Sequence, residues 1–177
     1  CTDNLSDPEI ALPGEYFNSV LYTGNSTARS ITGVGFAPDF VWIKNLTGNS
    51  HSLSDSVRGV NKQLHSDTTA NESTATNQLT AFDSDGFSLG DGDDTNANTD
   101  GIISWSWKAG GAPTTDNLVA AGGTPTAGSV KIDGANLGSA LAGTIAATRL
   151  SANTTAGFST VIYTGTGVNA TVAHGLS

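Results

Sequence analysis

Two acidic loops contain the residues whose spacing comes nearest to a known binding chemistry. Ca²⁺ is held by several carboxylate and carbonyl oxygens, and these loops supply carboxylates at short intervals. The candidate ligands are Asp83, Asp85, Asp91 and Asp93. The helix-loop-helix calcium pattern is not met, because Asn96 stands where it requires glycine and Ile102 where it requires glutamate. We therefore expect solvated turns and no cofactor, with calcium as the alternative.

The other titratable residues form no pattern that indicates catalysis. His51, His65 and His174 lack the spacing of zinc ligands, and no cysteine cluster accompanies them. A Ser-His-Asp set drawn from His51, Asp55 and any serine is expected by chance in so serine-rich a chain, and we expect no nucleophile elbow. The carboxylates cannot be paired as acid and base from the sequence. We expect no catalytic residue and therefore no enzyme.

Three tryptophans are candidates for binding through their rings. Aromatic faces stack on the apolar faces of sugars, which makes Trp42, Trp105 and Trp107 the glycan-binding candidates. In the stretch IISWSWK, Trp105 and Trp107 alternate with serines and share a strand face with Ile103, while Trp42 shares a face with Phe40. Large aromatic residues on one strand face usually belong to a hydrophobic core. We therefore expect these three rings to be core residues.

Composition limits the class of protein to which these residues belong. The 177 residues carry a formal net charge of −9, and 13% of them are charged. Such an acidic surface disfavours nucleic acid and anionic membranes, both of which attract Lys and Arg. The chain has no run of about 20 apolar residues, so we expect no membrane insertion. Cys1 is the only cysteine, which excludes an internal disulfide and leaves pairing with another molecule open.

Abundant Thr, Ser, Gly and Asn favour β-strands joined by hydrogen-bonding turns. We predict an all-β protein built on an antiparallel β-sandwich of jelly-roll or lectin-like type, followed by an extended linker and the start of a second copy. The predicted organisation is a linker from a preceding domain at residues 1–12, the sandwich at 13–111, a Gly/Pro/Thr-rich linker at 112–128 and an arm with a truncated repeat at 129–177.

Alternation and turn residues predict the main strands. We expect strands at residues 16–23, 40–44 and 102–108, with 27–32 folding back as the hairpin partner of the first. Residues 90–101, which contain few apolar side chains, are expected to form an exposed loop. For residues 137–150 a helix and an extended connector against a neighbouring chain both remain open, because glycines interrupt the helical spacing.

The opening of the first strand is written again near the C-terminus. Residues 158–165 match residues 17–24, including the tripeptide YTG, and with one residue dropped 175–176 match 35–36. A spacing of about 140 residues is too long for one layer of a solenoid, so each copy should be a domain. We expect a second copy that is cut short and a chain that is a piece of a longer protein.

Long stretches of the chain resemble a known kind of module. These are SVLYTGN, GVGFAPDFVWIKN, DSVRGV, TAFDSDGFSLG, VKIDGANLGSALAGTIAATRLSANTTAGF and YTGTGVNATVAHGL. They resemble a module that recurs in large virion proteins of tailed bacteriophages, notably phages of marine bacteria. The resemblance covers nearly the whole chain. It implies tandem YTG-containing modules downstream of a SPRY-like or concanavalin-like domain, a lectin-like sandwich, and no catalytic residues.

From this resemblance we expect a non-enzymatic structural protein of the virion, a module of a tail fibre, spike or head appendage. Its expected partners are copies of itself or other virion proteins, with host-surface glycans as candidate ligands. One alternative is a capsid decoration or cement protein whose arm at residues 128–150 packs on a neighbouring subunit. The other is a carbohydrate-binding module of an extracellular enzyme or adhesin.

Overall fold

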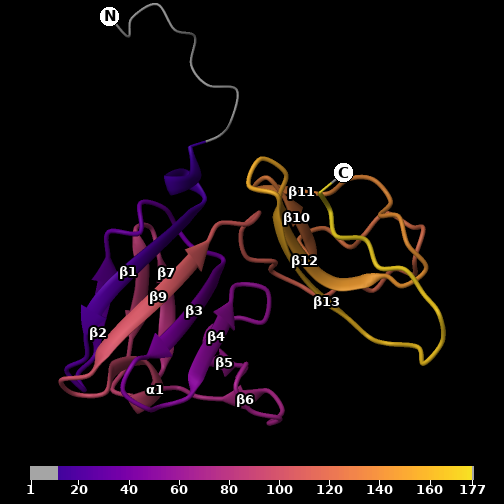
Figure 1. Ribbon diagram of the computed structural model, residues 1–177. Coiled ribbons are helices and arrows are strands. Elements are labelled where there is room, and N and C mark those ends of the chain that lie inside the picture. The colour runs from indigo at the N-terminus through magenta and orange to yellow at the C-terminus, as the bar shows by residue number, and fades with distance from the viewer. Residues whose placement is uncertain (1–11, 177) are drawn as a thin grey trace, which may run out of the picture.

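The computed structural model describes residues 12–176 (Figure 1). The linker predicted at residues 1–12, including Cys1, lies outside this range except for Leu12. The elements in chain order are η1 (Pro13–Glu15), β1 (Phe17–Thr23), β2 (Arg29–Thr32), β3 (Phe40–Asn45), β4 (His51–Asp55), β5 (Lys62–Gln63), β6 (Ser73–Thr74), β7 (Leu79–Asp83), β8 (Gly86–Leu89), α1 (Asp93–Asn96), β9 (Gly101–Trp107), β10 (Val130–Ile132), β11 (Ala135–Asn136), β12 (Ala147–Asn153) and β13 (Phe158–Tyr163).

The first half of the chain is an antiparallel β-sandwich, as predicted. One sheet has the strand order β1-β9-β3-β4 and the other the order β2-β8-β7, and every pairing in them is antiparallel. Their facing sides enclose one hydrophobic cluster. It contains Ile31, Val34, Phe36, Val41, Ile43, Leu79, Phe87, Leu89 and Ile102, with Val20, Tyr22 and Phe82 packed against it. Burial of this cluster is the main force that holds the two sheets together.

The expected hairpin of residues 16–23 with 27–32 is wrong. The first strand, β1, pairs with β9, and β2 pairs with β8 in the opposite sheet. The turn after β1 therefore carries the chain across the sandwich instead of back along the same sheet. Both strands then place their apolar residues in one core, Val20 and Tyr22 from one side and Ile31 from the other. A hairpin is formed instead by β7 and β8, which pair directly with each other.

The face of β9 that we predicted to be buried is the outer one. Ile102, Ser104 and Ser106 point into the sandwich and are at most 1% exposed, whereas Trp105 and Trp107 lie half-buried on the outer side. The predicted alternation is correct, but the predicted direction is wrong. Small serines suit the inner face here because the core is filled by large side chains from other strands, among them Phe87 and Ile43.

Residues 90–101 are not the exposed loop that we expected. They contain the short helix α1, in which Thr95 and Asn96 are fully buried. The Asn96 side chain accepts a hydrogen bond from the Asn25 amide and donates to the carbonyls of Thr27 and Gly90, at 3.0, 2.8 and 2.7 Å. A polar side chain is tolerated in the interior when its hydrogen bonds are made, so low hydrophobicity did not mean exposure.

A second sheet follows the sandwich. Its order is β11-β10-β12-β13, in which β10 and β12 are parallel and the other pairs antiparallel. It has a hydrophobic cluster of its own, formed by Val130, Ala147, Leu150 and Ala152 with Ile132, Leu137, Leu141, Val161 and Leu176 against it. Residues 137–150 contain no helix, and their last part begins β12. The domain boundaries proposed from the sequence remain a prediction.

Candidate functional site

The outer side of the sheet β1-β9-β3-β4 carries a set of aromatic side chains. Strand register places Trp107 between Phe17 and Phe40, and Trp105 next to Trp42. The ring centroids are 4.9 Å apart for Phe17 and Trp107, 5.4 Å for Phe40 and Trp107, and 5.8 Å for Trp42 and Trp105. These separations are those of favourable tilted and edge-to-face pairs. We call these five residues the aromatic face.

Polar groups lie at one end of the aromatic face. The indole Nε1–H of Trp42 donates to Nδ1 of His51 on β4 at 2.8 Å, which requires that ring nitrogen to carry no proton. Lys44 follows Trp42 on the same side of β3, and its Nζ donates to the Asn49 carbonyl at 3.1 Å. Leu21, on the same side of β1, is 70% exposed. The Trp42 end therefore combines aromatic rings with hydrogen-bonding groups.

The other end of the aromatic face is covered by the second sheet. Phe158, the first residue of β13, stacks on Trp107 with ring centroids 5.8 Å apart and an angle of 19° between the planes. It also lies 5.9 Å from the ring of Phe40. Phe158 is the repeat equivalent of Phe17, which contacts the same indole. Trp107 is thus held by Phe17 and Phe40 of the first copy and by Phe158 of the second, and Trp105 and Trp42 are the tryptophans outside these contacts.

Backbone contacts bring the second sheet close to the sandwich. The Gly110 amide donates to Oγ of Ser151 on β12 at 2.9 Å. A Cβ atom added to Gly110 would lie 2.5 Å from the Ala152 carbonyl oxygen and 2.6 Å from that of Lys131, distances that side chains do not tolerate. Glycine is therefore needed at this position for the chain leaving β9 to pass against β10 and β12.

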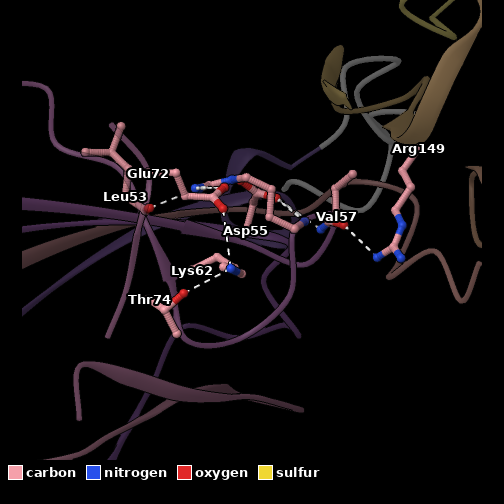
Figure 2. A network of polar contacts seen from close by, with 8 residues as sticks. Leu53, Asp55, Val57, Lys62, Glu72, Thr74 and Arg149 are labelled. Atoms are coloured by element: carbon pink, nitrogen blue, oxygen red, sulfur yellow. Dashed lines mark hydrogen bonds and ion pairs between the residues drawn. The ribbon is translucent and has the colours of Figure 1, made fainter. Parts of the chain in front are cut away.

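An ion-pair network stiffens the loop next to this junction (Figure 2). Arg58 pairs with Asp55 at 2.6 Å and donates to the Leu53 carbonyl at 3.0 Å, and both charged side chains are largely buried. Glu72 lies 3.5 Å from Arg58 and 3.6 Å from Lys62. On the far side, Nη1 of Arg149 on β12 donates to the Val57 carbonyl at 3.2 Å. The network thus connects the β4–β5 loop with the second sheet.

A cleft of about 770 Å³ lies between the sandwich and the second sheet, with Lys108, Asp133 and Asn153 among its lining residues. Asp39 also lines it, but its carboxylate is fully engaged. Oδ1 accepts from the Ser56 hydroxyl at 2.6 Å, and Oδ2 accepts from the amides of Ala109 and Gly111 at 2.8 and 3.2 Å. A carboxylate with three donors and little exposure positions the backbone and has no free oxygen for acid–base chemistry.

The four acidic candidates do not converge. Asp85 accepts from the amides of Gly33 and Gly35, and Asp83 accepts from the Ser88 hydroxyl. Asp91 accepts from Asn77, and Asp93 lies in the first turn of α1. Among residues 12–176 no group of three His, Cys, Asp or Glu side chains is placed to hold a metal ion. Asp83, Asp85 and Asp91 instead accept hydrogen bonds from separate partners.

The three histidines, all within residues 12–176, are bonded to separate partners. His51 is bonded to Trp42, His65 Nδ1 contacts the His51 carbonyl at 2.8 Å, and the His174 ring accepts from the Leu176 amide. Residues 86–90 do read G-x-S-x-G, but they form strand β8 and not a strand-to-helix turn. The central Ser88 is bonded to Ser30 and Asp83. No elbow is formed there.

Sequence reasoning found the three tryptophans and, by alternation, placed Phe40 on the face of Trp42. It missed Phe17, which lies on the aromatic face through strand register, a property that the sequence does not encode locally. A signal for Phe158 was available, because the repeat makes it the equivalent of Phe17.

Fold and face together define an all-β sandwich module with an outward aromatic face and a second sheet docked on one end of it. The chain belongs to the family described as "Domain of unknown function (DUF7483)", which matches residues 12–124 and again residues 121–177. The first match contains residues 17–24 and the second contains residues 158–165. No curated protein and no solved structure matches the chain. Within residues 12–176, no helix combines the length and apolar character needed to cross a membrane.

Proposed function

We propose that the chain is a non-enzymatic structural module of a virion, part of a tail fibre, spike or other appendage that contacts host-surface glycans through the aromatic face. The observation that carries this proposal is the position of Trp42 and Trp105 on the outer side of the sheet, at the end of the aromatic face away from the Phe158 contacts. The resemblance to tandem virion modules and the double family match support the repetitive, structural part.

The Trp42 end has the chemistry that sugars require. The apolar face of a sugar ring packs on an indole, while its hydroxyls need polar groups at the edge of that contact. His51 and Lys44 supply such groups beside Trp42. The acidic surface, with a net charge of −9, favours neutral or cationic glycans over strongly anionic ones. Weak binding per module is sufficient when many modules act together.

Catalysis is not part of the proposal because three carboxylates that the sequence offered or the cleft contains already have structural partners. Asp39 accepts three hydrogen bonds, Asp55 is paired with Arg58, and Asp85 accepts two backbone amides. None of the three stands free opposite a second acid in the cleft.

The structure bears on one of the two alternatives, the cement protein. A cement protein was expected to reach a neighbour with an arm at residues 128–150, but this segment contains β10 and β11 and enters β12 of the chain's own second sheet. A carbohydrate-binding module of an extracellular enzyme or adhesin would use the same aromatic face. Only the location of the protein distinguishes that alternative from a virion appendage.

Glycan binding is tested by titrating host-cell polysaccharide against the chain and recording tryptophan fluorescence together with calorimetry. We expect Trp42→Ala and Trp105→Ala to weaken binding by at least about tenfold, the effect of losing one good stacking contact. Leu118→Ala is the matched control, because Leu118 is an exposed apolar residue away from the sheet. Unchanged affinity in both tryptophan variants would overturn the glycan part. Electron cryomicroscopy of the particle tests the location.

A further inference from the structure

The repeated strand uses opposite edges in the two copies. In copy one, β1 lies at the edge of its sheet and is bonded only to β9. In copy two, the equivalent β13 also lies at an edge but is bonded only to β12. The two strands share their sequence pattern and differ in the strand to which each is hydrogen-bonded.

Hydrogen bonds at the ends of β1 identify the edge that faces β9. The Lys108 amide donates to the Tyr16 carbonyl at 2.8 Å, and the Gly24 amide donates to the Asp100 carbonyl at 2.9 Å. Backbone N–H and C=O groups point alternately to the two edges of a strand. Those of the even-numbered residues of β1 therefore point to β9, and those of the odd-numbered residues point to the free edge. The Ser19 amide, on the free edge, is bonded instead to the side chain of Asn18.

The same reasoning applied to β12 identifies the bonded edge of β13. The Leu150 amide donates to the Ser129 carbonyl, and the Ala152 carbonyl accepts from the Asp133 amide, so these residues face β10. Ser151 and Asn153 must then face β13, where their partners are Thr160 and Phe158. The backbone of Ser159, Val161 and Tyr163 therefore points to the open edge.

The repeat shows which edge of β1 is equivalent to the open edge of β13. Ser159, Val161 and Tyr163 correspond to Asn18, Val20 and Tyr22, the residues through which β1 is bonded to β9. The open edge of β13 is thus equivalent to the edge through which β1 is hydrogen-bonded to β9. We propose that it receives a β9-type strand, with the pattern of Gly101–Trp107, from a further DUF7483 module, so that β13 is shared between the second sheet and the sandwich of that module.

Side-chain environments support this occupant independently of the backbone. Val20 and Val161 each pack on the hydrophobic cluster of their own copy, and Phe36 and its equivalent Leu176 do the same. The tyrosines differ. Tyr22 is packed in the sandwich with its hydroxyl donating to the Thr95 carbonyl at 2.7 Å, whereas Tyr163 is 50% exposed. The position that is partly buried beside β9 in copy one is half exposed in copy two.

A shared strand has a consequence for the shape of an array. A sheet running β11-β10-β12-β13 and continuing into the β9-type strand would cross from one module to the next without a flexible joint. Phe158 would meanwhile keep its stacking on Trp107 of the preceding sandwich. This inference rests on the repetitive part of the proposed function and does not depend on glycan binding.

The test uses the full chain and a synthetic peptide with the sequence of residues 101–108, followed by hydrogen exchange of individual amides. We expect the amides of Ser159, Val161 and Tyr163 to exchange at least about tenfold more slowly in the presence of the peptide. A peptide N-methylated at residues 102, 104 and 106 cannot form these bonds and should have no effect. The matched peptide, N-methylated at 103, 105 and 107, should still protect the same three amides.

A chain variant provides the second arm. Ser159→Pro removes one amide from the open edge, a change that edge strands tolerate, and should weaken peptide binding at least about tenfold, with Ser159→Ala as the control. The proposal is overturned if the unmodified peptide protects none of the three amides, or if both methylated peptides act alike. It is also overturned if these amides are already protected without peptide by self-association of the chain. Glycan binding at Trp42 is measured separately, so either idea can fail alone.

Discussion

Phe158 and Trp107 stack with their ring centroids 5.8 Å apart and their planes 19° from parallel, although 50 residues of chain separate them. Trp107 belongs to the sandwich, and Phe158 belongs to the repeated strand of the second copy. The contact places part of the aromatic face inside the junction of the two sheets and leaves Trp42 and Trp105 outside it. The same sheet face therefore serves intramolecular packing at one end and, in our proposal, binding at the other.

Removing the ring of Phe158 should loosen this junction. We expect Phe158→Ala to lower the free energy of unfolding by about 1–2 kcal/mol, because an aromatic pair and partly buried apolar area are lost. Denaturant unfolding followed by tryptophan fluorescence measures the change, with a red-shifted native emission as Trp107 gains water. Thr160→Ala, on the same side of β13, is the control. A Phe158→Ala protein as stable as that control would show that the stacking contributes nothing.

Tyr22 should make stability dependent on alkaline pH. Burial raises the pKa of Tyr22 above its ordinary value, an effect that the nearby guanidinium of Arg29 partly opposes. Because the folded-state pKa is the higher one, this contribution is complete below the ordinary pKa of about 10 and is lost as the pH rises above it. We expect the free energy of unfolding to decline between about pH 10 and the folded-state value.

The variant Tyr22→Phe isolates that effect. It removes the hydroxyl and its hydrogen bond to the Thr95 carbonyl, at a cost of about 1 kcal/mol near neutral pH, and should flatten the alkaline decline. Urea unfolding at a series of pH values measures both. Tyr163→Phe serves as the control, since Tyr163 is half exposed. An alkaline decline that persists unchanged in Tyr22→Phe would contradict this assignment.

Arg58 should matter more than the other cations of its network. Its partner Asp55 has a side chain only 3% exposed, so Arg58→Ala leaves a buried carboxylate without its counter-ion and should cost about 3 kcal/mol. Lys62→Ala removes a contact whose partners are 40% and 39% exposed, and should cost less than about 1 kcal/mol. Thermal or denaturant unfolding of the two variants measures the loss of unfolding free energy in each. Equal losses in both would argue against the assigned roles.

Local patterns predicted much of this fold. Alternation and turn residues were sufficient to predict an all-β sandwich and the strands observed as β1, β3 and β9. The internal repeat was sufficient to identify β13 as the counterpart of β1. These features depend on the side-chain period of two and on glycine and asparagine at turns, both of which are properties of neighbouring residues.

Long-range packing decided the features that the sequence reasoning missed. The alternation in β9 is symmetric, and the bulk of Phe87 on the opposite sheet and of Ile43 on the neighbouring strand β3 favours serines facing inward and tryptophans outward. Asn96 is buried because residues 6, 69 and 71 positions away supply its hydrogen-bond partners.

The same distinction holds for the candidate site and the open edge. Residue types alone were enough to name Trp42, Trp105 and Trp107 as candidates for stacking. Their exposure, their register with Phe17 and Phe40, and the edge that β13 presents depend on which strands pair, because a sheet joins residues far apart in the chain. Pairing depends on the burial available to the whole chain, so it could be read only from the folded molecule.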